Sequence, residues 1–192
     1  MSPAQVGSRR LTVDFFTHSH RISTQFLVRG RPLIATLNDH TLSYIELDIA
    51  YVSRIDKPGD LVADYAISIV RKENVSFCVV AAQVELALKA VPQAQYLSRR
   101  SRHAFCTVPS FEIEGQIDVP GSLDLHQMMA IGTERFMPIH DATATISLLQ
   151  SVSFSGELIL VNKERIQVFC VSDPAVRGAS SAPAATAPRG SR

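Results

Sequence analysis

The chain contains an internal repeat with an offset of 91 residues. The segment Val70–Val75 (VRKENV) returns as Val161–Ile166 (VNKERI), and the same offset pairs Ile22 with Ile113. Further matched pairs are Gln25 with Gln116, Val28 with Val119 and Gly30 with Gly121, and, after a one-residue slip, Tyr44 with Phe136, Leu47 with Ile139 and Ala50 with Ala142. Matches over so long a stretch favour a tandem duplication of one small unit, which constrains the fold more than any other feature.

The chain length of 192 residues accommodates two such units. We expect β-units at residues 11–81 and 102–172, a flexible N-terminus at 1–10, a helix-containing linker at 82–101 and a disordered tail at 173–192. The tail consists mostly of Ala, Ser, Pro, Gly and Arg, which bury little apolar surface. A unit of this size buries a small fraction of its surface by itself, so packing the two units together would stabilise both.

Each unit is predicted to be mainly β, with one short helix. Alternating polar and apolar residues at Glu112–Val119 indicate a strand with one solvated face, whereas Leu33–Leu37 has helical spacing. Two strands close each unit, and the four polar residues between them (71–74 and 162–165) predict a tight hairpin. The predicted fold class is therefore mainly β, with two homologous small β-barrels or bent sheets in tandem.

Composition limits the environment and the partners. Hydrophobic residues make up 46% of the chain and charged residues 19%, which leaves apolar surface for contacts between units or subunits. The net charge of +1 lacks the basic excess typical of duplex-DNA binders. The N-terminal basic residues precede no apolar h-region, and the most apolar stretch (75–91) carries Glu85 and Lys89. We therefore expect a cytoplasmic protein without membrane insertion.

The candidate chemical groups form no recognisable catalytic or metal-binding motif. Cys78, Cys106 and Cys170 are odd in number and lie in apolar runs without a CxxC pair, which predicts buried, reduced thiols. The sequence contains no Gly-x-Ser-x-Gly elbow, phosphate loop or HExxH segment. We expect no enzyme activity, no metal site and no cofactor.

The repeated pattern resembles known protein families. An Arg-Ile pair and a later Val, followed by a helix, a hydrophobic strand and Val-Asn-Lys-x-x-Ile, resembles a family of uncharacterised bacterial proteins built from small β-units. This resemblance covers most of both repeats and implies no activity. The order of parts is also similar to Sm-like barrels, where an Ile-Arg-Gly-x-x-Val hairpin follows a long bent strand; residues 70–75 and 161–166 occupy that place. The Arg-Gly dipeptide and the Asp-x-x-Met-Asn segment that reads RNA are missing here, so the similarity implies a fold and not RNA binding.

The repeated polar segments are the first candidate binding site, because Lys72-Glu73 recurs as Lys163-Glu164. These segments are either solvated turns or matched charges presented to a symmetric partner. The candidate partner-binding residues are Arg71, Lys72, Glu73, Lys163, Glu164 and Arg165. The sequence thus favours a non-catalytic scaffold or adaptor that forms a homo-oligomer or binds a protein partner through its duplicated β-units.

The alternative is a nucleic-acid-binding module of Sm-like type. It depends on the basic segment that contains Arg99, Arg100 and Arg102, which is expected to lie in the exposed linker. Binding of this kind would weaken steeply with salt, because it depends on contacts with phosphate groups.

Overall fold

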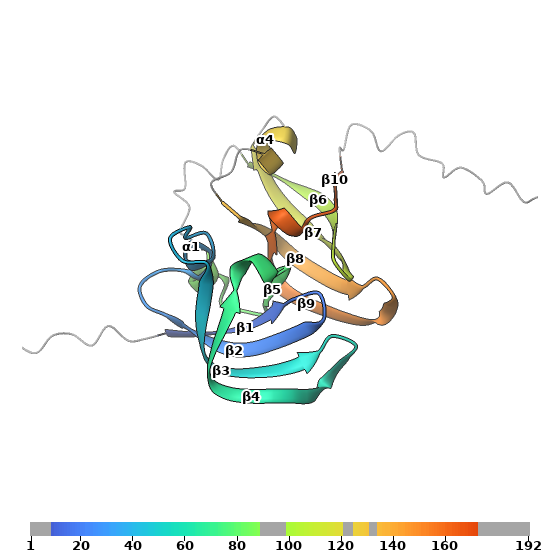
Figure 1. The fold of residues 1–192 in the computed structure, drawn as a ribbon. Helices are drawn as coiled ribbons and strands as arrows, with labels where there is room; N and C mark the ends of the chain where they lie inside the picture. The colour runs from blue at the N-terminus through green and yellow to red at the C-terminus, as the bar shows by residue number, and fades with distance from the viewer. Residues whose placement is uncertain (1–8, 89–98, 121–124, 131–133, 173–192) are drawn as a thin grey trace, which may run out of the picture.

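The computed structural model describes residues 9–88, 99–120, 125–130 and 134–172, and its strands form one ten-stranded antiparallel sheet (Figure 1). The prediction of a mainly β fold is confirmed. The first half contains β1 (Arg9–Phe16), β2 (His20–Val28), α1 (Leu33–Leu37), β3 (Tyr44–Arg54), β4 (Lys57–Arg71), a 3-10 turn (Lys72–Asn74), β5 (Phe77–Val80) and α2 (Val84–Ala87). The second half contains β6 (Arg99–Val108), β7 (Phe111–Pro120), α4 (Leu125–Ala130), β8 (Phe136–Ile146), β9 (Leu149–Asn162), a 3-10 turn (Lys163–Arg165) and β10 (Val168–Val171).

The strand order is β10-β6-β7-β8-β9-β5-β1-β2-β3-β4. Within each half the fifth strand lies beside the first, followed by the second, third and fourth. The two halves meet where β9 pairs antiparallel with β5. β4 and β10 consequently form the two outer edges of the sheet, near the bottom and the top of Figure 1.

The predicted hairpin at the end of each half is wrong. β4 pairs with β3, whereas β5 pairs with β1 and β9, so the 3-10 turn at Lys72–Asn74 carries the chain away from β4. The physical reason lies in β5, Phe77–Val80, whose four side chains are all buried. A strand that is apolar on both faces suits a central position in a sheet, where both faces are covered.

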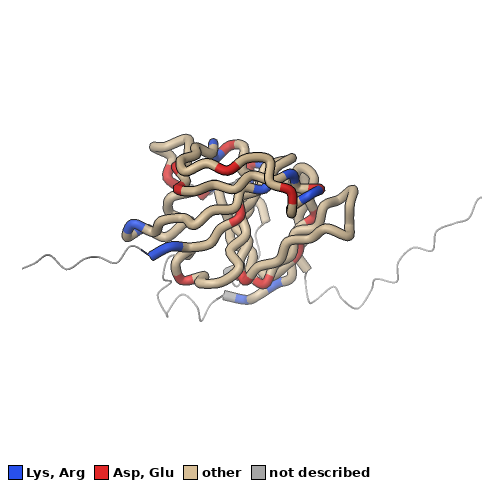
Figure 2. Tube along the Cα trace, turned by 90° about the horizontal axis from the view of Figure 1, so that it is seen from below, with Lys and Arg blue, Asp and Glu red and all other residues tan. Residues whose placement is uncertain are grey.

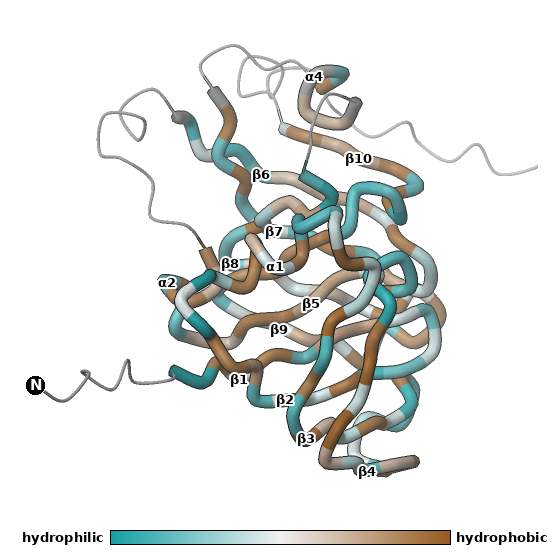
Figure 3. Tube along the Cα trace, turned by 60° about the vertical axis from the view of Figure 1, so that its left-hand side comes forward, coloured by the Kyte–Doolittle hydropathy of each residue, from teal (hydrophilic) through white to brown (hydrophobic). Residues whose placement is uncertain are grey.

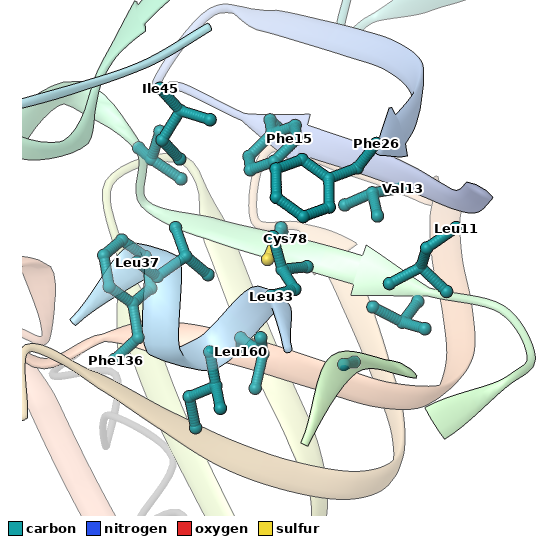
Figure 4. Close-up of a cluster of buried hydrophobic side chains, with 14 of the residues drawn as sticks. Leu11, Val13, Phe15, Phe26, Leu33, Leu37, Ile45, Cys78, Phe136 and Leu160 are labelled. Atoms are coloured by element: carbon teal, nitrogen blue, oxygen red, sulfur yellow. The ribbon is translucent and has the colours of Figure 1, made fainter. Parts of the chain in front are cut away.

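The core consists of two clusters, one for each half, and the strands at the junction contribute to both. Leu33 and Leu37 of α1 pack in the first cluster together with Phe136 and Leu160 of the second half (Figure 4). The second half therefore supplies side chains that complete the core of the first half.

The second cluster is centred on phenylalanines from both halves. Phe16 and Phe77 of the first half stack with ring centroids 4.5 Å apart, and Phe111 meets Phe77 edge to face at 4.8 Å. The ring centroid of Phe154 lies 4.6 Å from that of Phe16. Aromatic pairs in such geometries add stabilisation beyond the burial of their surface. The core of the second half thus includes two rings of the first half.

Three predicted features differ in detail or lie outside the described residues. The short helix α2 is present at the start of the predicted linker, but β6 begins at Arg99, inside the segment expected to be linker. Cys78 and Cys106 are buried as predicted, whereas Cys170 is exposed because β10 is an outer edge strand. Of the N-terminus predicted to be flexible (1–10), Arg9 and Arg10 belong to strand β1, whereas residues 1–8, residues 89–98 of the predicted linker and the tail at 173–192 lie outside the described part of the chain.

No helix in the described ranges is long and apolar enough to cross a membrane.

Candidate functional site

The junction of the two halves, formed by Phe77–Val80 of β5 and Leu158–Val161 of β9, is called the joint here. Its register pairs Phe77 with Val161 and Val80 with Leu158, and all eight side chains are buried. The space between the two strands is tight, because a Cβ atom at Gly156 would lie 2.7 Å from the carbonyl oxygen of Val80. The joint is therefore a tightly packed internal interface that covers both faces of the paired strands.

Asn162 connects the two 3-10 turns at the end of the joint. Its buried Nδ2 donates to the carbonyl oxygens of Lys72 (3.3 Å) and Val75 (2.9 Å), and its Oδ1 accepts from the Glu164 backbone N–H (3.1 Å). The backbone N–H of Asn162 donates to the Ser76 carbonyl oxygen at 2.9 Å. One amide side chain thus bonds to polar backbone groups of both turns, in a place that water does not reach.

Arg165 adds a second connection between the same turns. Its Nε donates to the Glu73 carbonyl oxygen at 2.6 Å, and its Nη2 donates to Asn74 Oδ1 at 3.3 Å. The two segments predicted as partner-binding turns therefore lie against each other within one chain. Sequence reasoning identified both segments, but it did not identify Asn162; the replacement of Arg71 by an uncharged amide in the second copy was the available signal.

Lys72, one of the predicted partner-binding residues, has a buried side chain. Its Nζ donates to the carbonyl oxygen of Thr36 in α1 (2.6 Å) and to that of Asp39, two residues after α1 (2.7 Å). Burial lowers the pKa of Lys72 from its ordinary value, against the opposing effect of the Asp39 charge. Hydrogen bonds from Thr41 hold the pKa of the Asp39 carboxyl below its ordinary value, so that charge is retained. Lys72 therefore joins the turn after β4 to α1 and the residues that follow it.

Replacing Lys72 with methionine is expected to lower the free energy of unfolding by about 1–3 kcal/mol at neutral pH, because two carbonyl oxygens lose their donor. The lowered pKa adds a pH dependence. Between the folded-state pKa and 10.5 the unfolded chain binds more protons, so the wild type gains stability relative to Lys72→Met as pH rises through that window. Urea unfolding of both proteins at neutral pH and at about pH 10 measures this change. Lys57→Met, at an exposed lysine, is the control, and an equal pH response in all three proteins would contradict the assignment.

The remaining predicted partner-binding residues lie on or beside the two contacting turns and differ in their exposure. Arg71 and Glu73 are exposed and lie 3.5 Å apart as an ion pair, whereas Glu164 pairs with Arg135 at 3.1 Å. Lys163 is half-buried, with its Nζ 3.4 Å from the Met128 carbonyl oxygen. Exposed ion pairs of this kind stabilise a fold little, so these side chains remain available to a partner.

The outer edges carry a surface that sequence reasoning did not locate. Hydrophobic stretches run along β3 and β4 at the end of the sheet (Figure 3). The exposed large side chains there are Leu61, Val62, Tyr65, Ile67 and Ile69 on β4, and Tyr44, Ile49 and Tyr51 on β3. On the opposite edge, Val168 of β10 is also exposed. Contiguous apolar surface on an edge strand is a typical feature of an interaction site, because such an edge also presents backbone groups able to pair.

The candidate nucleic-acid-binding residues lie on strand β6. Arg100 and Arg102 are two residues apart on this strand, so they lie on the same face, and Arg100 is exposed. On the neighbouring strand β7, Asp118 pairs with Ser101, between these two arginines, whereas Glu112 and Glu114 lie toward the far end of the ladder. Acidic and basic positions are interspersed along the tube in Figure 2. Phosphate contacts need basic side chains gathered on one surface, and Arg100 and Arg102 supply two such side chains on one face of β6.

The described residues offer little to covalent or metal chemistry. Among them, no group of three His, Cys, Asp or Glu side chains is placed to hold a metal ion. Burial raises the pKa of Cys106 to about 12 and that of Cys78 still further, so both thiols stay protonated and unreactive near neutral pH. A groove of about 340 Å³ beside α1 is lined by Arg29 and Arg31 as well as by Glu46 and Asp48. Its mixed charges single out no ligand class.

Comparison of the chain with protein-family models, with curated proteins and with solved structures found no match.

Proposed function

We propose that this protein is a non-catalytic scaffold, made by duplication of one five-stranded unit, that associates with further copies of itself through its outer sheet edges. The observation that carries the proposal is the exposure of Ile67 and Ile69 on β4, at 68% and 65%. The positions 91 residues later, Leu158 and Leu160, are fully buried in the joint. The fourth strand of each half thus carries similar apolar side chains, which lie in an interface in the second half and in solvent in the first half.

The pairing registers support the duplication. Phe16 pairs with Phe77 in the first half, and the positions 91 residues later, Thr107 and Val168, pair in the second half. The backbone irregularities correspond as well. Ile49 on β3 and Asp141 on β8, which correspond after the one-residue slip, have positive φ values of 53° and 46°. Positive φ is rare for residues other than glycine, and a shared one supports a common ancestor for the two strands.

Light scattering coupled to size exclusion tests the proposal. At tens of micromolar we expect the wild type to run as an oligomer, and the double variant Ile67→Lys/Ile69→Lys to run as a monomer, because charges on an edge strand oppose pairing. Leu148→Lys is the matched control, since Leu148 is a 98% exposed apolar residue in the β8–β9 turn, away from both edges. A monomeric wild type at that concentration would overturn the proposal.

Binding of nucleic acid is the alternative function, and the interspersed charges around β6 and β7 favour it less. The ratio of absorbance at 260 and 280 nm in the same experiment tests it. A protein peak that carries nucleic acid and loses it in an Arg100→Ala/Arg102→Ala variant would move the assignment to this alternative.

A further inference from the structure

The joint inside the chain defines a geometry for contacts between chains. The repeat offset of 91 residues relates Phe77–Val80 of β5 to Val168–Val171 of β10. The same offset relates Leu158–Val161 of β9 to residues 67–70 of β4. The two strands that form the joint thus correspond to the two strands that form the outer edges, one at each end of the sheet. Each outer edge strand therefore corresponds to a strand that already has a partner at the joint.

Side chains at the joint alternate between the two cores. On β5, Phe77 and Val79 belong to the core of the second half, and Cys78 belongs to the core of its own half. On β9, Leu158 and Leu160 belong to the core of the first half. Every second side chain of each joint strand therefore reaches across into the neighbouring half.

The exposure of the outer strands follows the same alternation. Val168 and Cys170, which correspond to Phe77 and Val79, are exposed, as are Ile67 and Ile69, which correspond to Leu158 and Leu160. The intervening side chains pack against the core of their own half; these are Val70 on β4 and Phe169 and Val171 on β10. The exposed positions are thus the ones that would enter the core of a neighbouring unit, and no described strand pairs with the outer side of β4 or of β10.

We propose that β10 of one copy pairs antiparallel with β4 of the next in the register of the joint, so that copies assemble head to tail. This proposal rests on the proposed self-association and specifies its geometry. Val168 then pairs with Val70, Phe169 with Ile69, and Cys170 with Ser68 of the neighbouring copy. Because the two edges differ, the contact is heterologous and repeats from copy to copy, either closing into a ring or continuing as a filament.

The turns at the end of the joint have counterparts in this contact. Arg71 occupies the position of Asn162, and it is exposed at the free edge. In the head-to-tail register its guanidinium meets the 3-10 turn at Lys163–Arg165 of the neighbouring copy, where Glu164 is exposed. Arg71 supplies donors where Asn162 supplies an amide at the joint, and its charge is complementary to that of Glu164. This contact uses two of the residues that the sequence predicted for partner binding.

One position sets the length of the paired stretch. Tyr65 stands where the joint has Gly156, and a Cβ atom at Gly156 would lie 2.7 Å from the Val80 carbonyl oxygen. The residue of β10 that corresponds to Val80 is Val171, so the neighbouring strand bends away there. Pairing in the register of the joint therefore covers Val168 to Cys170.

An engineered disulfide tests both the register and the direction. Ser68→Cys places a thiol opposite the native, exposed Cys170 of the next copy, at the Cα separation of about 4.5–5.5 Å that antiparallel pairs share and a disulfide spans. With oxidised glutathione as the oxidant, we expect a ladder of covalent multimers under non-reducing electrophoresis. Ile69→Cys is the control, because its side chain points to the opposite face of the strand, and it should give little cross-linking with Cys170.

Two further samples identify the bonded pair. Ser68→Cys/Cys170→Ser should give no ladder alone, and, mixed with wild type, it should give only covalent dimers that join residue 68 of one copy to residue 170 of another. Dimers of the double variant alone would mean that two β4 edges meet, and would overturn the head-to-tail arrangement. If Ser68→Cys lowers the oligomer mass, Val70→Cys/Val168→Cys in a Cys170→Ser background tests the same register.

Light scattering of the same samples under reducing conditions separates the two levels of the proposal. Oligomers without a ladder from either cysteine pair leave self-association standing and overturn this register. Monomers without a ladder overturn both.

Discussion

Replacing Phe77 with alanine is expected to lower the free energy of unfolding by about 3–5 kcal/mol. The ring is fully buried, stacks on Phe16 at 4.5 Å and meets Phe111 edge to face. Although Phe77 lies on a strand of the first half, it packs in the core of the second half. The loss should therefore destabilise both halves together, and urea unfolding should keep a single transition when followed by circular dichroism and by tyrosine fluorescence.

The matched control for this prediction is Val168→Ala, because Val168 occupies the same position of the repeat on the outer edge. We expect a change below about 1 kcal/mol when it is measured in the monomeric Ile67→Lys/Ile69→Lys background, where the side chain is solvated. Equal losses for Phe77→Ala and Val168→Ala would contradict the distinction between joint and edge. Separate transitions for the two halves would contradict their shared cores.

Replacing Asn162 with leucine, which is similar in shape, is expected to lower the free energy of unfolding by about 3–5 kcal/mol. The substitution removes the Asn162 hydrogen bonds to the Val75 carbonyl oxygen and the Glu164 N–H, and each group orphaned at the buried end of the joint costs roughly 1–3 kcal/mol. The Lys72 carbonyl oxygen loses one of its two donors and keeps the Val75 N–H. Chemical denaturation of the purified variant measures this loss. Amide hydrogen exchange of Glu164, whose N–H bonds to Asn162, should accelerate in parallel.

Arg71→Leu is the control for Asn162→Leu, because it changes the corresponding position of the first half, where the side chain is exposed. Its effect in the monomeric background should stay within about 0.5 kcal/mol. A large loss in Arg71→Leu together with a small one in Asn162→Leu would reverse the assignment of the two turns.

The sequence predicted the strands within each half well, because their signals are local. Alternation at Glu112–Val119 and the helical spacing of Leu33–Leu37 reflect which side chains face the core, and β7 and α1 lie there. The predicted hairpin failed because four polar residues between two strands describe a turn without specifying its direction. The fully apolar Phe77–Val80 was the available signal for a central strand.

The candidate site was predicted less well, because burial and neighbours depend on distant parts of the chain. Lys72 and Lys163 lie 91 residues apart and each precedes a glutamate, yet Lys72 is buried on carbonyl oxygens of Thr36 and Asp39, whereas Lys163 is half-buried. The arginines at Arg99 and Arg100 were assigned to an exposed linker, but they extend strand β6. A basic run in a polar context carries no signal for backbone pairing with β7.

By itself, the sequence determined the repeat, the set of strands and the apolar character of both fourth strands, because composition and periodicity are properties of each segment. Only the tertiary structure decided which of those strands lies in the interior of the sheet and which lies at its edge. Ile67 and Leu158 have similar side chains, but one is exposed and the other fully buried. The physical reason is that strands pair through backbone groups that every residue carries, so the side chains alone do not select the partner. The two halves form one joint, between β5 and β9, which leaves β4 and β10 as the outer edges of the sheet.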